Sequence, residues 1–359
     1  KSIVQSVHTN RTLQLNSGST FENIVGGSGD DVLTGNALDN TFTGNAGNDT
    51  LTGRSGNDTL TGGTGDDSLF GNQGDDTFVF DPASTPETDT VSEYLNQGKD
   101  TLSFESLTTA VTLNLTKSIA QAVHTNRTLQ LNSGSTFENI VGGSGDDVLT
   151  GNALNNSFTG NGGNDTLTGA TGNDSLFGGL GDDIYVFGTA SSAEADTVTE
   201  GTNQGNDTLL FESLTTAVTL NLTKSIVQSV HTNRTLQLNS GSAFENIVGG
   251  SGDDVLTGNA LDNSFTGNAG NDTLTGAAGN DSLSGGLGDD TYIFGQASSP
   301  EADSVAEGTD QGTDTLIFES LSSGVTLNLT MSVVQSVHTN RTLQLNSGGT
   351  FENIVGGSG

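Results

Sequence analysis

Apolar residues recur along this chain at intervals of nine, separated by short polar loops that are rich in glycine. Between Gly26 and Val79, six consecutive nonapeptides each carry an apolar side chain at position eight, namely Leu33, Phe42, Leu51, Leu60, Leu69 and Phe78. The last three residues of a nonapeptide, such as Thr50, Leu51 and Thr52, alternate polar and apolar side chains, as a short half-buried strand does. The pattern predicts an all-β chain in which these strands stack and their position-eight side chains form the core.

A longer repeat contains these nonapeptides. The segment VHTNRTLQLNSG starts at four positions that lie 116, 107 and 107 residues apart: Val7, Val123, Val230 and Val337. We therefore divide the chain into three modules and the start of a fourth, at residues 1–116, 117–223, 224–330 and 331–359. Their nonapeptide blocks, with six, five and five copies, occupy residues 26–79, 142–186 and 249–293. The fourth copy stops inside its module, so we expect the parent protein to continue in both directions.

Each block is followed by a phenylalanine and a connecting segment of a different pattern. Short alternations of apolar and polar residues, such as DTLLFES, VTLNLT and RTLQLN, run through these segments with turn residues between them. We predict that the connecting segments form wider turns of the same solenoid.

The composition argues against an ordinary globular core. Only 31% of the 359 residues are hydrophobic and 52 are glycine, whereas globular chains are about 45–50% apolar. With 43 acidic against 9 basic residues and a net charge of −34, disorder is the first alternative. The fixed register of apolar residues between glycines favours a stacked solenoid instead, because disordered sequence needs no such register.

The charge also indicates which partners to expect. Binding to nucleic acids or to anionic membrane surfaces needs clustered lysine and arginine, so a net charge of −34 predicts neither. No apolar run approaches the length of about 18 residues that a membrane span needs, and we predict no membrane insertion. Cations are the expected partners.

Position six of the nonapeptide carries the candidate chemistry. It is aspartate in nearly every copy, and we expect the glycines at positions one and four to let the loop take left-handed conformations. Such loops offer carboxylate and carbonyl oxygens, which calcium prefers in sets of about six to eight. The nitrogen and sulfur ligands of zinc or copper sites are missing from the loops. We therefore predict multiple bound Ca²⁺ ions, without which stacked carboxylates about 5 Å apart would repel one another.

The nonapeptides GGSGDDVLT, GNAGNDTLT and GGLGDDTYI resemble the G-G-x-G-x-D-x-U-x repeat of the repeats-in-toxin, or haemolysin-type, family. The resemblance implies a right-handed parallel β-roll with two nonapeptides per turn and calcium between the loops of motifs n and n+2. The implied metal ligands in the nonapeptides are Asp31, Asp49, Asp58, Asp67, Asp76, Asp147, Asp165, Asp174, Asp183, Asp254, Asp272, Asp281 and Asp290. Three further aspartates in G-x-D-T-L-x-F segments are possible extra ligands: Asp100, Asp207 and Asp314.

The same resemblance implies which aspartates share an ion. The pairs are Asp31 with Asp49, Asp49 with Asp67, Asp58 with Asp76, Asp147 with Asp165, Asp165 with Asp183, Asp254 with Asp272, and Asp272 with Asp290. One motif per module places asparagine at position six, at Asn40, Asn156 and Asn263, and we expect weaker sites there because an amide oxygen is neutral. If two motifs make one turn, the extra nonapeptide of the first block adds half a turn. The segment after Phe80 should then leave the stack on the opposite side from those after Phe187 and Phe294.

We predict no enzymatic activity for the chain. The histidines His8, His124, His231 and His338 hold one equivalent position in each module, as structural or surface residues would. The H-E-x-x-H motif of zinc proteases and the serine nucleophile elbow do not occur. Nearly all of the paired carboxylates that a glycosidase would need fall at the loop positions assigned to calcium. The exceptions are Glu22, Glu138, Glu245 and Glu352, for which we expect a structural role at a strand edge.

These observations favour a structural or adhesive repeat array outside the cell, such as a fibre, stalk or adhesin of a bacterial surface, stiffened by calcium. The resemblance implies type I secretion of the parent protein, and copies of the chain or cell-surface glycans are further possible partners. An accessory calcium-binding segment of a secreted enzyme or toxin is the main alternative, which a non-repetitive flanking domain would favour. A third reading, a flat threonine face that binds ice or carbohydrate, rests on the T-L-T strands alone.

Overall fold

A computed structural model describes eight ranges of the chain: residues 3–8, 11–15, 21–94, 97–201, 204–241, 243–308, 312–346 and 351–357. Every element in these ranges is a β-strand. The chain divides into two compact units, Lys1–Asp165 and Thr166–Gly359. This division falls inside the second nonapeptide block, so the module boundaries after residues 116, 223 and 330 stay predictions.

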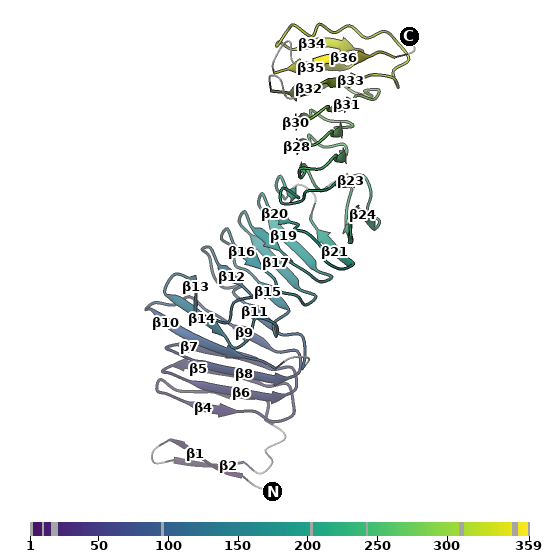
Figure 1. Cartoon of the computed structure of the whole chain (residues 1–359). Helices are drawn as coiled ribbons and strands as arrows, with labels where there is room; N and C mark the ends of the chain where they lie inside the picture. The colour runs from purple at the N-terminus through teal and green to yellow at the C-terminus, as the bar shows by residue number, and fades with distance from the viewer. Residues whose placement is uncertain are drawn as a thin grey trace. The chain divides into compact units, whose positions relative to one another are not determined.

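The first unit stacks its nonapeptide strands into two parallel sheets, drawn in purple to blue in Figure 1. The odd-numbered motifs of the first block lie in the β4 sheet, which contains β4 (Val32–Thr34), β6 (Thr50–Ser55), β8 (Ser68–Gln73), β10 (Glu87–Ser92) and β14 (Arg127–Leu131). The even-numbered motifs lie in the β5 sheet, which contains β3 (Asn23–Val25), β5 (Thr41–Ala46), β7 (Thr59–Thr64), β9 (Thr77–Val79), β11 (Thr101–Ser103), β15 (Asn139–Val141) and β17 (Ser157–Gly162). Motif n therefore pairs with motif n+2, and two nonapeptides make one coil.

The first unit contains three further pieces. A hairpin of β1 (Ile3–His8) and β2 (Arg11–Leu15) precedes the sheets. The β4 sheet ends at a second antiparallel hairpin, in which β13 (Gln121–His124) folds back on β14. A new parallel sheet begins with β12 (Thr112–Asn114), which pairs with β16 (Val148–Thr150), the strand of the next block's first motif.

The second unit repeats this arrangement. One parallel sheet contains β18 (Thr166–Thr168), β20 (Ile184–Val186), β22 (Thr208–Leu210), β26 (Asn246–Val248), β28 (Ser264–Ala269), β30 (Ser282–Leu287), β32 (Glu301–Ala306), β35 (Arg341–Leu345) and β34 (Gln335–His338), the last antiparallel. A second contains β23 (Thr219–Asn221), β27 (Val255–Thr257), β29 (Thr273–Thr275), β31 (Thr291–Ile293), β33 (Asp314–Ile317) and β36 (Phe351–Val355). A shorter run contains β19 (Ser175–Leu180), β21 (Glu194–Thr199), β25 (Arg234–Leu238) and β24 (Gln228–His231), again with an antiparallel last strand.

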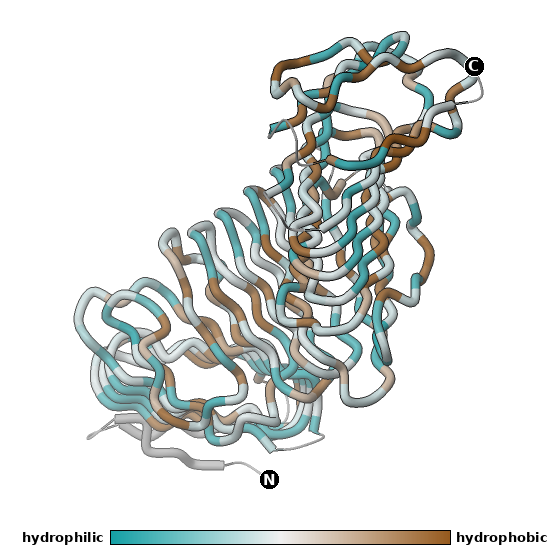
Figure 2. The backbone as a smooth tube through the Cα atoms, turned by 45° about the horizontal axis from the view of Figure 1, so that its top comes forward, coloured by the Kyte–Doolittle hydropathy of each residue, from teal (hydrophilic) through white to brown (hydrophobic). Residues whose placement is uncertain are grey.

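The core lies between the sheets and is one side chain wide at each motif. In β6 the burial alternates, with Leu51 fully buried and Thr50 and Thr52 half-buried, because successive side chains of a strand point to opposite faces. The same position is fully buried in neighbouring coils, at Phe42, Leu60 and Phe78. In Figure 2 the hydrophobic positions accordingly recur from one coil to the next. The predicted all-β parallel roll and its apolar ladder are confirmed.

The loop conformation differs from the prediction at position one and, in the first motif of each block, at position four. The position-four glycine is left-handed, as predicted, in motifs after the first, with φ of +114° at Gly47, whereas Gly29, Gly145 and Gly252 in the first motif of each block have no such φ. Position two is also left-handed, for example at Asn45 with φ of +80°. The prediction of a left-handed glycine at position one is wrong, because Gly44 has no such φ. Glycine is needed there for space, since a Cβ on Gly44 would overlap Asp49 Oδ2 and the carbonyl oxygen of Gly62.

The extra nonapeptide of the first block shifts the phase by half a turn, as predicted. The strand that follows this block, β10, pairs with β8, which belongs to an odd-numbered motif. The corresponding strands after the later blocks, β21 and β32, pair with β19 and β30, which belong to even-numbered motifs. The connecting segments are themselves coils of the stack, because their strands continue the same parallel ladders.

Candidate metal sites

The position-six aspartates stand in columns, one residue per coil, on each side of the stack. The backbone N–H of Asp31 donates to Asp49 Oδ1 at 2.7 Å, and that of Asp49 donates to Asp67 Oδ1 at 2.8 Å. The same contact, at 2.7 Å, joins Asp58 to Asp76, Asp147 to Asp165, Asp254 to Asp272, and Asp272 to Asp290. The structure therefore places these six predicted pairs on neighbouring coils. The pair of Asp165 and Asp183 belongs to both units and stays a prediction.

In several column aspartates, one of the two carboxylate oxygens has no hydrogen-bond partner. Oδ2 is buried and accepts no hydrogen bond in Asp49, Asp58, Asp67, Asp76, Asp272 and Asp290. At Asp49 this oxygen and the carbonyl oxygen of Gly62, from the next coil of the column, border one small volume beside Gly44 that a single Cβ would fill. Carboxylate and carbonyl oxygens are the ligands that calcium prefers, so the residues present fit this ion.

The electrostatics of the columns indicate that they need a cation. Burial raises the pKa of Asp58 to about 6 and those of Asp67 and Asp76 to about 7, although a backbone N–H bonded to each carboxylate lowers it. Neighbouring carboxylates raise these pKa values further, as Asp89 and Asp49 do for Asp67. A bound cation would remove this penalty by neutralising the charge that burial disfavours.

The three extra aspartates continue one column beyond each block. Asp100 Oδ1 accepts from the N–H of Asp76 at 3.0 Å, and Asp207 and Asp314 make the same contact with Asp183 and Asp290. The remaining predicted ligands lie in the other columns: Asp174 donates its N–H to Asp196 Oδ1 at 3.0 Å, and Asp281 Oδ1 accepts from Asn263 N–H at 2.9 Å.

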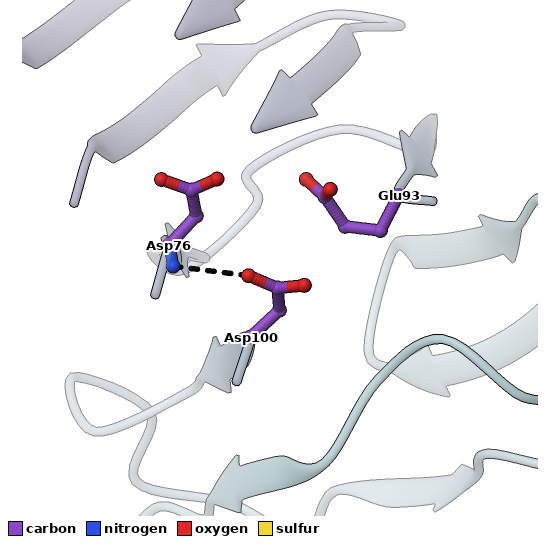
Figure 3. Close-up of side chains that lie close together, drawn as sticks. All are labelled: Asp76, Glu93 and Asp100. Carbon is purple, nitrogen blue, oxygen red and sulfur yellow. Dashed lines mark hydrogen bonds between the residues drawn. The ribbon is translucent and has the colours of Figure 1, made fainter. Parts of the chain in front are cut away.

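Sequence reasoning missed a glutamate beside each extra aspartate. Three buried carboxylates, of Asp76, Glu93 and Asp100, lie with one oxygen each within 4.8 Å of one another, as Figure 3 shows. The equivalent groups are Asp183, Glu200 and Asp207, and Asp290, Glu307 and Asp314. The available signal was the recurrence of Glu93, Glu200 and Glu307 at the module spacing of 107 residues.

An arginine ends the other column of each block. Asp67 is followed on the next coil by Asp89, whose Oδ1 accepts from the Asp67 N–H at 3.1 Å. Arg127 forms buried ion pairs with Asp89 and Glu87 and lies 5.3 Å from the centroid of the Phe80 ring. Arg234 and Arg341 repeat these contacts with Glu194 and Asp196, and with Glu301 and Asp303. These arginines were also missed, although they too recur with the module.

The asparagine motifs close their coils without a free carboxylate. Asn156 Oδ1 accepts from Asn152 N–H at 2.9 Å, and its Nδ2 donates to the carbonyl oxygen of Glu138 at 3.0 Å. The Glu138 carbonyl oxygen also accepts from Ser157 N–H at 3.0 Å, so the amide adds a second donor to it. The weaker site at this motif stays a prediction.

The remaining residues singled out in the sequence have plain structural contacts. His124, His231 and His338 are in exposed hydrogen bonds, with Thr109, Thr216 and Ser323. Glu138, Glu245 and Glu352 accept the N–H groups of Asp100, Asp207 and Asp314 and so extend the columns by one more coil. The side chains of His8 and of residues before Phe21 lie outside the described part of the chain.

The family comparison matches the same segments that carry the columns. A family model described as RTX calcium-binding nonapeptide repeat (4 copies) matches residues 17–51, 25–60, 52–81, 133–167, 159–189, 240–260 and 257–292. This chain carries the calcium-binding repeats of the repeats-in-toxin family. No curated protein matches the chain.

Repeats of this family bind calcium, and the matched nonapeptides are those whose loops carry the buried carboxylates. The oxygens available in a loop are the free Oδ2 of a residue such as Asp49 and the position-one carbonyl of the next coil, that of Gly62. When bound, calcium supplies the positive charge that lets these buried carboxylates stay ionised.

Proposed function

We propose that this repeats-in-toxin chain is a segment of a secreted structural or adhesive array, without enzymatic activity, that calcium holds in its folded form. One observation carries the proposal: the connecting segments are coils of the same stack. In the first unit β9, β11 and β15 form one unbroken parallel ladder from the block into the next module, and β20, β22 and β26 do so in the second. Such continuity is what an extended array requires of its joints.

The charge of the chain supports folding outside the cell. At low calcium, 43 acidic residues against 9 basic ones repel one another and favour the unfolded chain. Calcium at millimolar concentration binds the native loops and stabilises them by mass action. Among the described residues, no helix has the length and apolar character needed to cross a membrane.

Calcium titration of the purified chain tests the folding step. We expect the β-sheet circular dichroism to be lost in chelator and restored by calcium but not by magnesium, because magnesium demands a tighter octahedral shell and keeps its waters. A β-sheet spectrum that persists in excess chelator would contradict calcium-dependent folding.

Imaging of the native material tests the structural role separately. A structural array predicts filaments or stalks of repeated coils whose length grows with the number of modules. Single molecules in which the repeats flank a compact catalytic domain would instead favour the accessory segment of a secreted enzyme or toxin.

A further inference from the structure

The two carboxylate columns have different neighbouring charges where each block ends. Two columns of carboxylates leave every block, and one of them ends at a buried arginine, such as Arg127 on Asp89 and Glu87. The other column passes through three buried carboxylates before it reaches Glu138, and the neighbouring charges that most raise the pKa of Glu93 belong to Asp100 and Asp76. At the end of the first column the Arg127 guanidinium offsets part of the charge of Asp89 and Glu87, whereas the clusters of the second column contain only carboxylates: Asp76, Glu93 and Asp100 in the first copy.

Glu93 lies beside the position-one glycine of the last motif, Gly71. Inside a block, the volume beside a position-one glycine is bordered by an aspartate Oδ2 and by the glycine carbonyl of the next coil, as at Gly44. At Gly71, in the last motif of the first block, a Cβ would overlap Asp76 Oδ2 and Glu93 Oε1. Glu93 therefore places a side-chain oxygen where the next nonapeptide would have placed a carbonyl.

Hydrogen bonds hold this carboxylate in place as an acceptor. Gly71 N–H donates to Glu93 Oε1 at 2.6 Å, and Asn72 N–H lies 3.1 and 3.0 Å from the two carboxylate oxygens. In the second block Tyr185 replaces the amide, because its hydroxyl accepts from Gly178 N–H at 2.7 Å and donates to Glu200. Two different sets of donors thus hold the equivalent carboxyl groups, Glu93 and Glu200.

Unpartnered oxygens point into the same space in every copy. Asp76 Oδ2, Glu200 Oε2 and Asp290 Oδ2 are buried and accept no hydrogen bond, and each of these residues is at most 2% exposed. Figure 3 shows the three carboxylates of the first copy facing one another across this space. A buried oxygen without a donor is costly, and a hard cation is the partner that three such carboxylates fit.

We propose that each of these clusters is a calcium site of a second kind, with three carboxylates, built by a glutamate that lies outside the nonapeptide repeat. The ligands are Asp76, Glu93 and Asp100 in the first copy, Asp183, Glu200 and Asp207 in the second, and Asp290, Glu307 and Asp314 in the third. Two of the three come from the connecting segment, so the ion ties that segment to the last coil of its block. The inference rests on calcium binding by the repeats and not on the structural role of the array.

Removal of the three glutamates tests the site. The triple variant Glu93→Gln, Glu200→Gln, Glu307→Gln keeps the side-chain shape and removes the charge. The matched control, Glu105→Gln, Glu212→Gln, Glu319→Gln, removes the same charge from exposed positions of the same modules. Calorimetric titration with calcium should show three fewer ions bound in the first variant, one per cluster, and no change in the control.

A charge-preserving variant covers the case in which the triple variant does not fold. Glu→Asp at the same three positions keeps the charge but shortens the side chain by one methylene, so the carboxylate retreats from the cluster. We expect three ions to bind at least tenfold more weakly than in the unchanged chain. Wild-type stoichiometry and affinity in either variant would overturn the proposal and would leave the imaging test of the array unaffected.

Discussion

At the scale of a single residue, the position-one glycine and the position-six aspartate of a motif share one small volume. Gly44 has ordinary backbone angles, so its lack of a side chain serves only the oxygens of Asp49 and Gly62 beside it. The nonapeptide pattern thus contains glycines with two different functions. The one at position four takes the left-handed turn in motifs such as that of Gly47, and the one at position one leaves room for the oxygens of the neighbouring aspartate and glycine.

Substitution of a position-one glycine should abolish a site without disturbing the turn. In Gly44→Ala the Cβ would overlap both oxygens, and we expect one calcium fewer and a loss of about 1–3 kcal/mol from overpacking. Gly29→Ala is the matched control, because nothing lies within 4 Å of its Cβ and its φ is ordinary. Calorimetry and thermal melts in calcium measure both effects, and equal behaviour of the two variants would contradict the assignment.

An aspartate inside a column should matter more than one at its end. Asp49 is bonded both to Asp31 and to Asp67, whereas Asp31 belongs to the first coil and has a partner on one side only among the described residues. Asp49→Asn should therefore remove or weaken two sites, and Asp31→Asn one. The measurement is calcium stoichiometry by equilibrium dialysis, and equal losses would contradict ion sharing between motifs n and n+2.

At the scale of an element, the asparagine motif is a joint that does not depend on metal. Asn263 Nδ2 donates to Glu245 O at 3.1 Å, and Asn263 Oδ1 accepts from Asn259 N–H at 2.9 Å. The amide thus links two coils through its own hydrogen bonds. We expect these coils to be the last to unfold when calcium is removed.

Replacing Asn263 by aspartate, the usual residue at position six, should make this coil less stable without calcium and more stable with calcium. Asn263→Asp removes one of two donors to Glu245 O, the other being Ser264 N–H, and without calcium we expect a loss of about 0.5–1.5 kcal/mol from the missing hydrogen bond. In calcium the same variant should gain affinity at the site shared with Asp281. Hydrogen exchange of this coil with and without calcium distinguishes the two effects, and a variant less stable in both conditions would count against the joint.

The sequence predicted the elements that repeat at short range and missed contacts made at long range. Position-eight burial follows from the nine-residue period, and the resemblance to the repeats-in-toxin family implied the pairing of motifs n and n+2. Glu93 and Arg127 are not part of that period. They reach the columns because the connecting segment coils back onto the block, and Arg127 meets Asp89 across 38 residues. A comparison of the three modules, rather than of single nonapeptides, would have singled out both.

At the scale of the whole molecule, the raised pKa values give a dependence on pH whose sign calcium reverses. In the metal-free protein, burial raises the pKa of Asp67 from 3.8 to about 7 and that of Glu93 from 4.5 to about 8. A group with a higher pKa in the folded than in the unfolded chain binds its proton on folding. The metal-free fold should therefore be most stable below about pH 4 and lose stability as the pH rises through 7 to 8.

With calcium bound the direction changes, because the ligands must be deprotonated and acid competes with the metal. Without calcium, the β-sheet circular dichroism of dialysed protein should increase as the pH falls from 8 to 4, whereas with calcium the melting temperature should decrease over the same change. The same direction of change under both conditions would contradict the role of the buried carboxylates.

The sheets of each unit end at different heights along the stack, and this has a mechanical consequence. Where the β4 sheet ends at its hairpin, the β5 sheet runs on, and the second unit shows the same overlap at β24 and β25 beside β20, β22 and β26. Because of this overlap, no single plane across the stack separates one module from the next. Under tension we therefore expect the coils to unfold one at a time, with no preferred breaking point at the module boundary.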